Sequence, residues 1–288
     1  MKGYPMKKKI IIISIIVILL LLVLFCIWQN NSLVVSNYEY KTSKIGEDLD
    51  GYRIVQISDL HNKSFGKDNE RLIRKIKECK PDMIVVTGDV IDSNRTNVDI
   101  AMNFMEQATK LAPVYYITGN HELWVEDKEY KAFTDRMAQS DVIWMKDEVM
   151  EITKGKESFT LIGLDDNSLG NISQSGNYTL NQLLEQNVSE NNTGKLKLLL
   201  AHEPQYFESY IKSDVDYIFT GHAHGGQVRL PGIGGLVAPD QGFLPKYTAG
   251  EFTENGTTMV VSRGLGNSII PVRVFNRPEI VCVTLRKE

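Results

Sequence analysis

Five short apolar runs of this chain, rich in β-branched residues, each end abruptly in polar residues. They occupy residues 52–61, 82–92, 113–122, 196–204 and 215–224. Residues 72–79 and 98–111, which lie between these runs, repeat apolar side chains with helical spacing. Strands that alternate with helices predict an α/β fold, in which ligands bind beyond the carboxyl ends of the strands. We therefore expect the five polar clusters to meet at one edge of a sheet.

All five histidines of the chain lie in these clusters, and none lies in a helical segment. They are His61, His121, His202, His222 and His224, and the same clusters contain Asp59, Asp89 and Asn120. An isolated histidine is as often a core or surface residue as a ligand, but clustered His and Asp side chains mark metal or catalytic sites. An extended backbone would also point His222 and His224 the same way. The sequence therefore predicts one shared metal or catalytic site.

The residue types in this set narrow the choice of metal. Imidazole and carboxylate ligands without thiolate suit zinc, manganese or iron(II). The set exceeds the three or four ligands that one zinc ion takes, so we expect two divalent metal ions bridged by a carboxylate. Two ions roughly 3.5–4 Å apart can hold the attacking and leaving oxygens of a phosphate ester and can supply hydroxide near neutral pH.

The N-terminus is apolar from residue 10 to residue 28 except for Ser14. As a helix that rises about 1.5 Å per residue, this run nearly matches the roughly 30 Å hydrocarbon core of a bilayer. Four lysines precede the run and only two occur in the twenty residues after it, so the positive-inside rule keeps residues 1–9 in the cytoplasm. We expect a transmembrane signal-anchor at 10–28, a polar stalk at 29–50 and an extracytoplasmic folded domain at 51–288.

A cleaved signal peptide is the alternative interpretation of the same segment. The apolar run is long for an export signal, and no A-x-A-like cleavage site follows it. The bulky Phe25 before Cys26 argues against processing as a lipoprotein. The uncleaved anchor is therefore the preferred interpretation.

Composition excludes several other classes of protein. With 42% hydrophobic and 24% charged residues among 288, the chain has the balance of a globular protein of one large domain or two small ones. Its formal net charge of -4 provides no basic surface for nucleic acid, so nucleic-acid binding is not expected. Three cysteines are too few for a disulfide framework or a thiolate metal site, and at most Cys79 and Cys282 could pair.

The polar clusters resemble the five ordered motifs of the calcineurin-like metallophosphoesterases. They are D-x-H at 59–61, G-D-x-x-D at 88–92, G-N-H-E at 119–122, the separate His202 and G-H-x-H at 221–224. The resemblance covers residues 52–224 and implies the four-layer α/β/β/α sandwich of that family, with residues 51–288 as the catalytic domain.

The resemblance also implies a role for each residue of the set. Asp59, His61 and His224 would bind one metal ion. Asn120, His202 and His222 would bind the other, and Asp89 would bridge the two. His121 would stay off the metals and would either stabilise the transition state or protonate the leaving oxygen.

The C-terminal part of the chain resembles a narrower group. Residues 221–235 and 262–280 are similar to the bacterial membrane-associated branch that includes UDP-2,3-diacylglucosamine hydrolases and related phosphodiesterases. This implies a phosphodiester or pyrophosphate substrate, including a lipid-linked or nucleotide-sugar one. The loop 231–245 offers apolar side chains that would contact an acyl chain or pack in the core: Ile233, Leu236, Val237, Phe243 and Leu244.

Two other functions stay open on the sequence alone. The first is a phosphomonoesterase or protein phosphatase of the same fold, because a metal centre recognises only the phosphate. The second is a metal-binding envelope protein without catalysis. His121 separates hydrolysis from mere binding, since a binding site has no need of a histidine beside the ligand Asn120 but off the metals.

Several further polar residues have less specific readings. We expect Asp92 and Glu122 to support the ligands or brace a loop. Arg263 and Arg273 are arginines that could grip a phosphate, but most arginines are solvated surface residues. Asp165 and Asp166 are expected to form a turn after a strand. Residues 167–195, rich in Asn, Ser and Gly, are expected to form a surface excursion, and Gly225 and Gly226 a tight loop.

Overall fold

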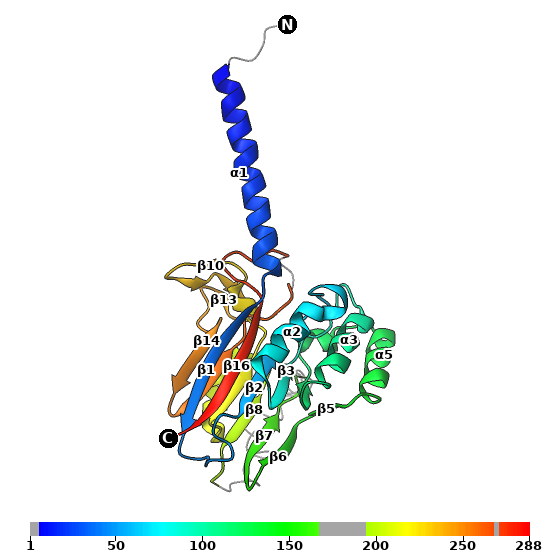
Figure 1. The fold of residues 1–288 in the computed structure, drawn as a ribbon, viewed down its shortest axis with the longest axis vertical. Helices are drawn as coiled ribbons and strands as arrows, with labels where there is room; N and C mark the ends of the chain where they lie inside the picture. Colours follow the sequence, from blue (N-terminus) through cyan, green and yellow to red (C-terminus); the bar gives the residue numbers. More distant parts are fainter. Residues whose placement is uncertain (1–5, 167–193, 268–270) are drawn as a thin grey trace.

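The computed structural model describes residues 6–166, 194–267 and 271–288. Within this part of the chain, two six-stranded sheets form the body, and helix α1 (Met6–Asn31) projects from one end of it (Figure 1). The loop segment 167–195 that the sequence predicts to be a surface excursion lies almost entirely outside the described residues.

The first sheet has the strand order β1-β16-β2-β3-β4-β5. Its strands are β1 (Val34–Thr42), β16 (Glu279–Lys287), β2 (Arg53–Ile57), β3 (Met83–Thr87), β4 (Val114–Ile117) and β5 (Val142–Trp144). Strands β2 to β5 run parallel, while β16 is antiparallel to β2. Strands β3 and β4 are buried along their whole length, as expected for the centre of a sheet that is covered on both faces.

The second sheet has the strand order β14-β15-β9-β8-β7-β6. Its strands are β14 (Gly250–Glu254), β15 (Thr257–Val261), β9 (Tyr217–Thr220), β8 (Lys197–Leu200), β7 (Glu157–Gly163) and β6 (Glu148–Lys154). The four central strands are parallel and the two edge strands are antiparallel to their neighbours. Two small ribbons pair β10 (Arg229–Leu230) with β11 (Gly234–Gly235) and β12 (Val237–Ala238) with β13 (Gly242–Phe243).

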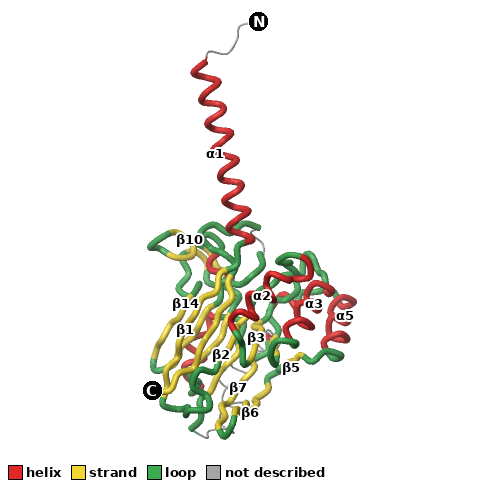
Figure 2. The backbone as a smooth tube through the Cα atoms, viewed as in Figure 1, coloured by secondary structure: helices red, strands yellow, loops and turns green. Residues whose placement is uncertain are grey.

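The inner faces of the two sheets pack against each other through a shared apolar core. Ile54 and Val85 of the first sheet lie in one cluster with Phe159, Leu198 and Phe219 of the second. Helices α2 (Glu70–Cys79), α3 (Val98–Ala108) and α5 (Asp127–Met137) cover the outer face of the first sheet (Figure 2). This arrangement confirms the predicted α/β class.

The outer face of the second sheet is covered more thinly in the described part of the chain. The short helix α8 (Phe207–Tyr210) packs there, flanked by the 3-10 turns η2 (Pro204–Tyr206) and η3 (Ile211–Ser213). The remaining short elements are the 3-10 turns η1 (Lys67–Asn69) and η4 (His224–Gly226) and the helix α4 (Asn120–Leu123).

The five predicted strands appear as β2, β3, β4, β8 and β9, and the two predicted helices as α2 and α3. The strands are divided between two sheets and do not share one sheet. Strands β2, β3 and β4 run parallel in the first sheet, and β8 and β9 run parallel in the second. The carboxyl ends of the two sets therefore meet across the sandwich.

The predicted stalk at 29–50 is wrong. Helix α1 continues to Asn31, and β1 pairs in parallel with β16 along its whole length. Half-buried Tyr38 and Tyr40 alternate with exposed neighbours, which is the pattern of an edge strand with one face on the core. The folded domain therefore begins with β1 and not at residue 51.

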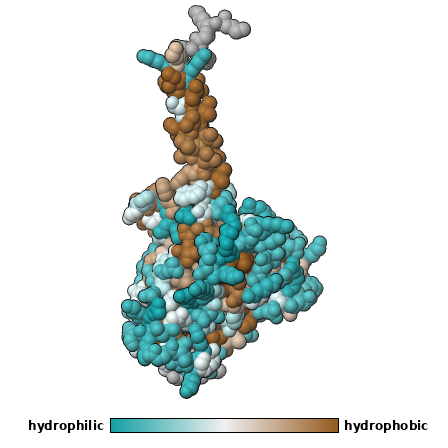
Figure 3. All heavy atoms as spheres, in the orientation of Figure 1, coloured by the Kyte–Doolittle hydropathy of each residue, from teal (hydrophilic) through white to brown (hydrophobic). Residues whose placement is uncertain are grey.

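Helix α1 is apolar on all sides and exposed along most of its length (Figure 3). It is long and apolar enough to cross a membrane. Among its residues only Gln29 is buried, where the helix meets the body. Its last turns contact the C-terminal part of the chain: the Phe25 and Phe275 ring centroids are 5.5 Å apart, and the Arg277 guanidinium lies 5.0 Å from the Trp28 ring centroid.

Cys79 of α2 and Cys282 of β16 are the one pair of cysteines that the sequence allows to form a disulfide. Both are free thiols. The two thiols are neighbours and share a hydrogen bond. This hydrogen bond, together with burial, raises the pKa of Cys79.

Candidate metal centre

The strand ends of both sheets deliver the predicted ligands to one buried place. Asp59 and His61 follow β2, Asp89 follows β3, Asn120 follows β4, His202 follows β8, and His222 and His224 follow β9. None of the seven is more than 7% exposed. The structure thus brings together every residue that the sequence selects as a metal ligand.

The first group consists of Asp59, His61, Asp89 and His224, whose ligand atoms all lie within 4.8 Å of one another. His61 Nε2 is 3.1 Å from His224 Nε2 and 3.4 Å from Asp89 Oδ2. Asp59 Oδ2 is buried and has no hydrogen-bond partner among the described residues. A cation fits between these groups, because it would separate the two imidazole lone pairs and satisfy the Asp59 oxygen.

The second group consists of Asp89, His202 and His222, to which Asn120 adds an amide oxygen. Asn120 Oδ1 is 3.0 Å from His202 Nε2 and 2.9 Å from His222 Nδ1. Asp89 Oδ2 is 3.3 Å from His202 Nε2. Asp89 belongs to both groups, so its carboxylate lies between two adjacent places for a cation.

The backbone at the centre is unusual for residues with a side chain. Five of the seven residues have φ in the left-handed region: Asp59 (52°), His61 (46°), Asp89 (54°), His222 (62°) and His224 (47°). Such conformations are uncommon outside glycine and cluster at functional sites. The expectation that an extended backbone points His222 and His224 the same way is wrong, because β9 ends at Thr220 and the two side chains enter different groups.

Two motif glycines permit the loops after β3 and β4 to approach each other. A Cβ at Gly88 would lie 2.5 Å from the Gly119 nitrogen and 2.7 Å from His202 Nδ1. A Cβ at Gly119 would lie 2.4 Å from Asp89 Oδ1. Any side chain at either position would therefore displace a ligand.

Outer hydrogen bonds orient the imidazole rings. The Thr87 carbonyl accepts from His202 Nδ1 at 2.8 Å, which leaves the Nε2 lone pair directed at the centre. Asp240 Oδ2 lies 2.9 Å from His222 Nε2, so His222 presents Nδ1 instead. Arg273 Nη2 lies 3.5 Å from His224 Nδ1.

The electrostatics of the site favour a cation. Burial lowers the pKa of His61 to about 3, although Asp89 acts in the opposite direction. Burial and the nearby Arg273 also hold the pKa of His224 well below its usual value. Burial raises the pKa of Asp89, but His202 outweighs it and keeps this pKa well below normal. His61 and His224 are therefore neutral and Asp89 is ionised, which are the forms that bind metal. Burial lowers the pKa of His202, but the charge of Asp89 outweighs burial and keeps this pKa well above normal, so His202 must release a proton when a cation binds.

Comparison with known proteins identifies the family. The calcineurin-like phosphoesterase family matches residues 52–226. The chain belongs to this family. It is 30% identical over 257 residues to the uncharacterized metallophosphoesterase YkuE of Bacillus subtilis, which covers 87% of this chain and 85% of the relative. It is 25% identical over 238 residues to the phosphodiesterase YaeI of Escherichia coli, with 81% of this chain and 82% of the relative covered.

More distant similarities agree with the fold. A transmembrane protein with a metallophosphoesterase domain from Danio rerio is 26% identical over 260 residues, which is 88% of this chain and 57% of that protein. The solved NAD nucleotidase of Haemophilus influenzae shares the fold with a TM-score of 0.52 at 15% identity, over 74% of this chain and 45% of that one. Membership in the family makes this protein a metal-dependent phosphoester hydrolase, and the family uses a dinuclear site of divalent metal ions. The similarity to UDP-2,3-diacylglucosamine hydrolases stays a prediction.

In this metallophosphoesterase, His121 lies at the centre but outside both groups of metal-binding side chains. It is 4% exposed, and its Nδ1 is 3.1 Å from Ser93 Oγ. Its ring meets the edge of His61 with centroids 4.4 Å apart, and its backbone N–H donates to Asp89 Oδ1 at 2.9 Å.

Glu122 and Asp92 support the metallophosphoesterase loops, as expected. Glu122 is fully buried and accepts from the backbone N–H groups of Asp89, Ile91 and Gly119 at 2.9, 3.1 and 2.8 Å. Burial and the charge of Asp89 raise its pKa to about 8. Asp92 accepts from the backbone of Asn94 and Arg95 and so braces the loop after β3.

The two arginines have structural partners. Arg263 Nη2 forms an ion pair with Glu279 at 2.7 Å. Arg273 is fully buried and not a solvated surface residue; it donates to the carbonyls of Gly266 and Arg263 at 3.0 and 2.8 Å.

Asp165 and Asp166 are not exposed turn residues, because each is only 4% exposed. Asp165 accepts hydrogen bonds from Thr118 and from Trp144 Nε1. Burial raises the pKa of Asp166 well above normal, and the charge of His202 opposes this shift only in part.

The loop after the G-H-x-H motif is mostly exposed and not core. Ile233, Val237, Phe243 and Leu244 are 65%, 42%, 72% and 53% exposed, and Leu236 is half-buried. The same loop carries Asp240, which forms a third group with Glu203 and His222. Glu203 directly follows His202, whereas Asp240 belongs to none of the five motifs, so the sequence gives no sign that the two acids lie close together.

Proposed function

We propose that this protein is a membrane-anchored phosphohydrolase with a dinuclear metal centre. We propose further that it cleaves a phosphodiester or pyrophosphate bond, including one in an envelope lipid or a nucleotide sugar. The observation that supports a dinuclear centre best is the position of Asp89, which belongs to both groups of ligand atoms. The phosphodiesterase YaeI among the relatives supports the bond type.

In the proposed assignment, Asp59, His61 and His224 hold one ion. Asn120, His202 and His222 hold the other, and Asp89 holds both. Manganese, iron or zinc suits this set of ligands, and two such ions would supply a water of lowered pKa and neutralise the phosphate charge.

The protein itself contributes orientation and a proton. Thr87 and Asp240 fix the rings of His202 and His222, and Glu122 holds the two ligand loops together. His121 is the proposed acid for the leaving oxygen, because it is buried beside the ligands without joining either group.

The roles of Asp89 and His121 are tested by separating metal content from turnover. Asp89→Asn removes the charge that holds two cations together, so metal content and turnover should fall together. His121→Ala should keep both metals and lower kcat by about two to four decades. Metal analysis by mass spectrometry, beside an assay with a manganese-loaded full-length chain and a phosphodiester, measures both. A His121→Ala protein that keeps nearly full rate with two bound metals would remove the catalytic role of His121, and one that has lost a metal would make His121 a ligand.

The substrate class is tested by a panel of phosphomonoesters, phosphodiesters and nucleotide-sugar pyrophosphates. We expect turnover of the diesters or pyrophosphates. Activity restricted to monoesters would reject this substrate class and leave the fold and family unchanged.

The proposed topology places residues 1–9 in the cytoplasm and the metal centre outside. It is supported by the lysines before α1 and by the apolar surface of that helix. Protease added to intact, wall-stripped cells should digest the folded domain; protection of this domain with an accessible N-terminus would reverse the orientation.

A further inference from the structure

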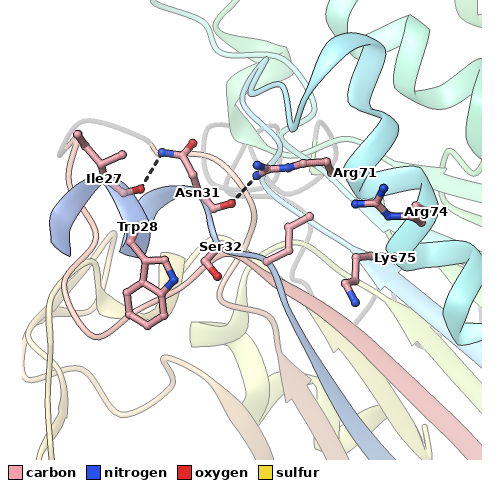
Figure 4. A pocket seen from close by; sticks show the side chains of 8 residues that line it. Ile27, Trp28, Asn31, Ser32, Arg71, Arg74 and Lys75 are labelled. Atoms are coloured by element: carbon pink, nitrogen blue, oxygen red, sulfur yellow. Dashed lines mark hydrogen bonds between the residues drawn. The ribbon is translucent and has the colours of Figure 1, made fainter. Parts of the chain in front are cut away.

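A pocket of about 370 Å³ lies where helix α1 joins the body (Figure 4). Ile27, Trp28 and Leu33 form one wall, and Arg71, Arg74 and Lys75 of helix α2 form the other. It is lined by the last turn of α1 and the chain just after it, so apolar and cationic side chains face each other at the end of the helix.

The positive charge of this pocket is poorly compensated. None of the described residues that line it is acidic. Arg71 Nη2 donates to the Asn31 carbonyl at 2.6 Å, which ties the two walls together without neutralising the charge. The side chain of Arg74 is exposed and makes no hydrogen bond or ion pair with any described residue. The Lys75 side chain forms an ion pair with the exposed Glu78 at 2.7 Å. Exposed pairs of this kind are weak.

The pocket lies at the level where a membrane would end. The apolar surface of α1 extends to Ile27 and Trp28, which are 55% and 51% exposed. Tryptophan is enriched at the boundary between hydrocarbon and headgroups. A bilayer crossed by α1 would therefore place its phosphate groups beside Arg71, Arg74 and Lys75.

We propose that this pocket binds the phosphate group of an anionic phospholipid, with the acyl chains along Ile27 and Trp28. This inference rests on the proposed membrane anchoring and is independent of catalysis. Guanidinium groups bind phosphate oxygens in a forked geometry. The lack of a lining carboxylate leaves no partner for the ammonium of a zwitterionic headgroup. The apolar wall distinguishes a lipid from free phosphate.

The test uses the full-length chain reconstituted in vesicles that contain spin-labelled phosphatidylglycerol or phosphatidylcholine. The ratio of the motionally restricted fractions of the two lipids measures the preference for the anionic lipid. We expect the double variant Arg74→Gln, Lys75→Gln to lose this preference by about fivefold for each cation, as about 1 kcal/mol per basic residue near an anionic surface implies. Arg71 stays in place because it also ties α2 to Asn31.

A matched variant, Lys110→Gln with Lys128→Gln, removes the same charge from exposed positions on other elements and should keep the preference of the parent chain. An equal loss in both variants would show a general charge effect and overturn the proposed site.

Flotation of the vesicles separates the proposed lipid site from the proposed membrane anchor. A chain that does not float with the vesicles contradicts the anchor itself. A chain that floats without a preference for phosphatidylglycerol contradicts only the pocket. Displacement of the lipid by glycerol phosphate at equal concentration would show that the site recognises free phosphate, which would also overturn the proposal.

Discussion

At the scale of single residues, Asp240 contacts a candidate metal ligand although it belongs to none of the five motifs. Its carboxylate lies 2.9 Å from His222 Nε2, and this hydrogen bond lowers the pKa of Asp240. A carboxylate behind a ligand histidine fixes the ring and raises its basicity. Asp240 therefore acts as a positioning residue for His222.

We predict that Asp240→Asn lowers metal affinity or activity by about 10- to 100-fold, as is typical for such outer partners. The metal dependence of the rate separates this from a loss of fold: higher metal concentration should recover most of the activity. Asp141→Asn, at an exposed position, is the control and should behave like the parent chain. Equal metal dependence in Asp240→Asn and the parent would remove the positioning role.

The sequence predicts the seven candidate ligands because each of them directly follows an apolar strand, and this is visible in a few consecutive residues. Asp240 carries no such signal. Glu203 follows His202 at the end of β8, but nothing in the local sequence marks it as a neighbour of Asp240. Asp240 lies in the turn between β12 and β13, 18 residues after His222, and only the fold of the loop brings the two side chains together. The left-handed conformations of five ligands were equally hidden, because they depend on how the loops cross.

At the scale of secondary structure elements, β1 shows what local patterns miss. Its polar residues lower the average hydrophobicity, and its partner β16 lies more than 200 residues away, with Val34 opposite Glu279. The polar residues hide the strand from a hydrophobicity pattern, and the pairing with β16 is not visible in a short window of sequence. By contrast, β3 and β4 are buried on both faces, and continuous apolar runs predict such strands well.

Tyr40 tests whether β1 contributes to stability. Its ring centroid lies 4.9 Å from that of Tyr217 in an edge-to-face arrangement, across from the second sheet. Tyr40→Ala should lower the free energy of unfolding by about 1 kcal/mol or more, since such ring pairs alone contribute about 0.5–1.5 kcal/mol. Asn37→Ala, on the exposed side of the same strand, should change it by less than about 0.5 kcal/mol. Denaturant unfolding of the full chain in detergent micelles measures both; equal effects would mean that β1 contributes no specific packing.

At the scale of the whole molecule, helix α1 and the exposed apolar loop 231–245 share one end of the body. Strand β10 and the Val274 segment are joined by a hydrogen bond from Arg229 N to Val274 O at 3.0 Å, and Phe275 packs on Phe25 of α1. Strand β13 lies at the same end of the body as this junction (Figure 1), and Phe243 in it and Leu244 after it are both exposed. If α1 spans a bilayer as proposed, these two side chains would enter its surface.

We predict that Phe243→Ser with Leu244→Ser lowers hydrolysis of a lipid-linked phosphodiester in vesicles by about tenfold or more, because burial of two such side chains contributes a few kcal/mol. Hydrolysis of a water-soluble diester should stay at the parent rate. Lys110→Ser is the surface control. A parallel fall with both substrates would place the two side chains in the catalytic site and reject a role at the membrane.

Arg273 connects the end of α1 to the candidate metal centre. Its backbone N–H donates to Asn30 Oδ1 at 3.1 Å, while its fully buried guanidinium lies beside His224. A centre held this close to the last turn of α1 cannot swing outward on a tether. If α1 spans the bilayer, catalysis is confined to a thin layer at its surface, and encounters occur by lateral diffusion. The rate would then follow the number of substrate molecules per unit area of membrane and not their concentration in the surrounding solution.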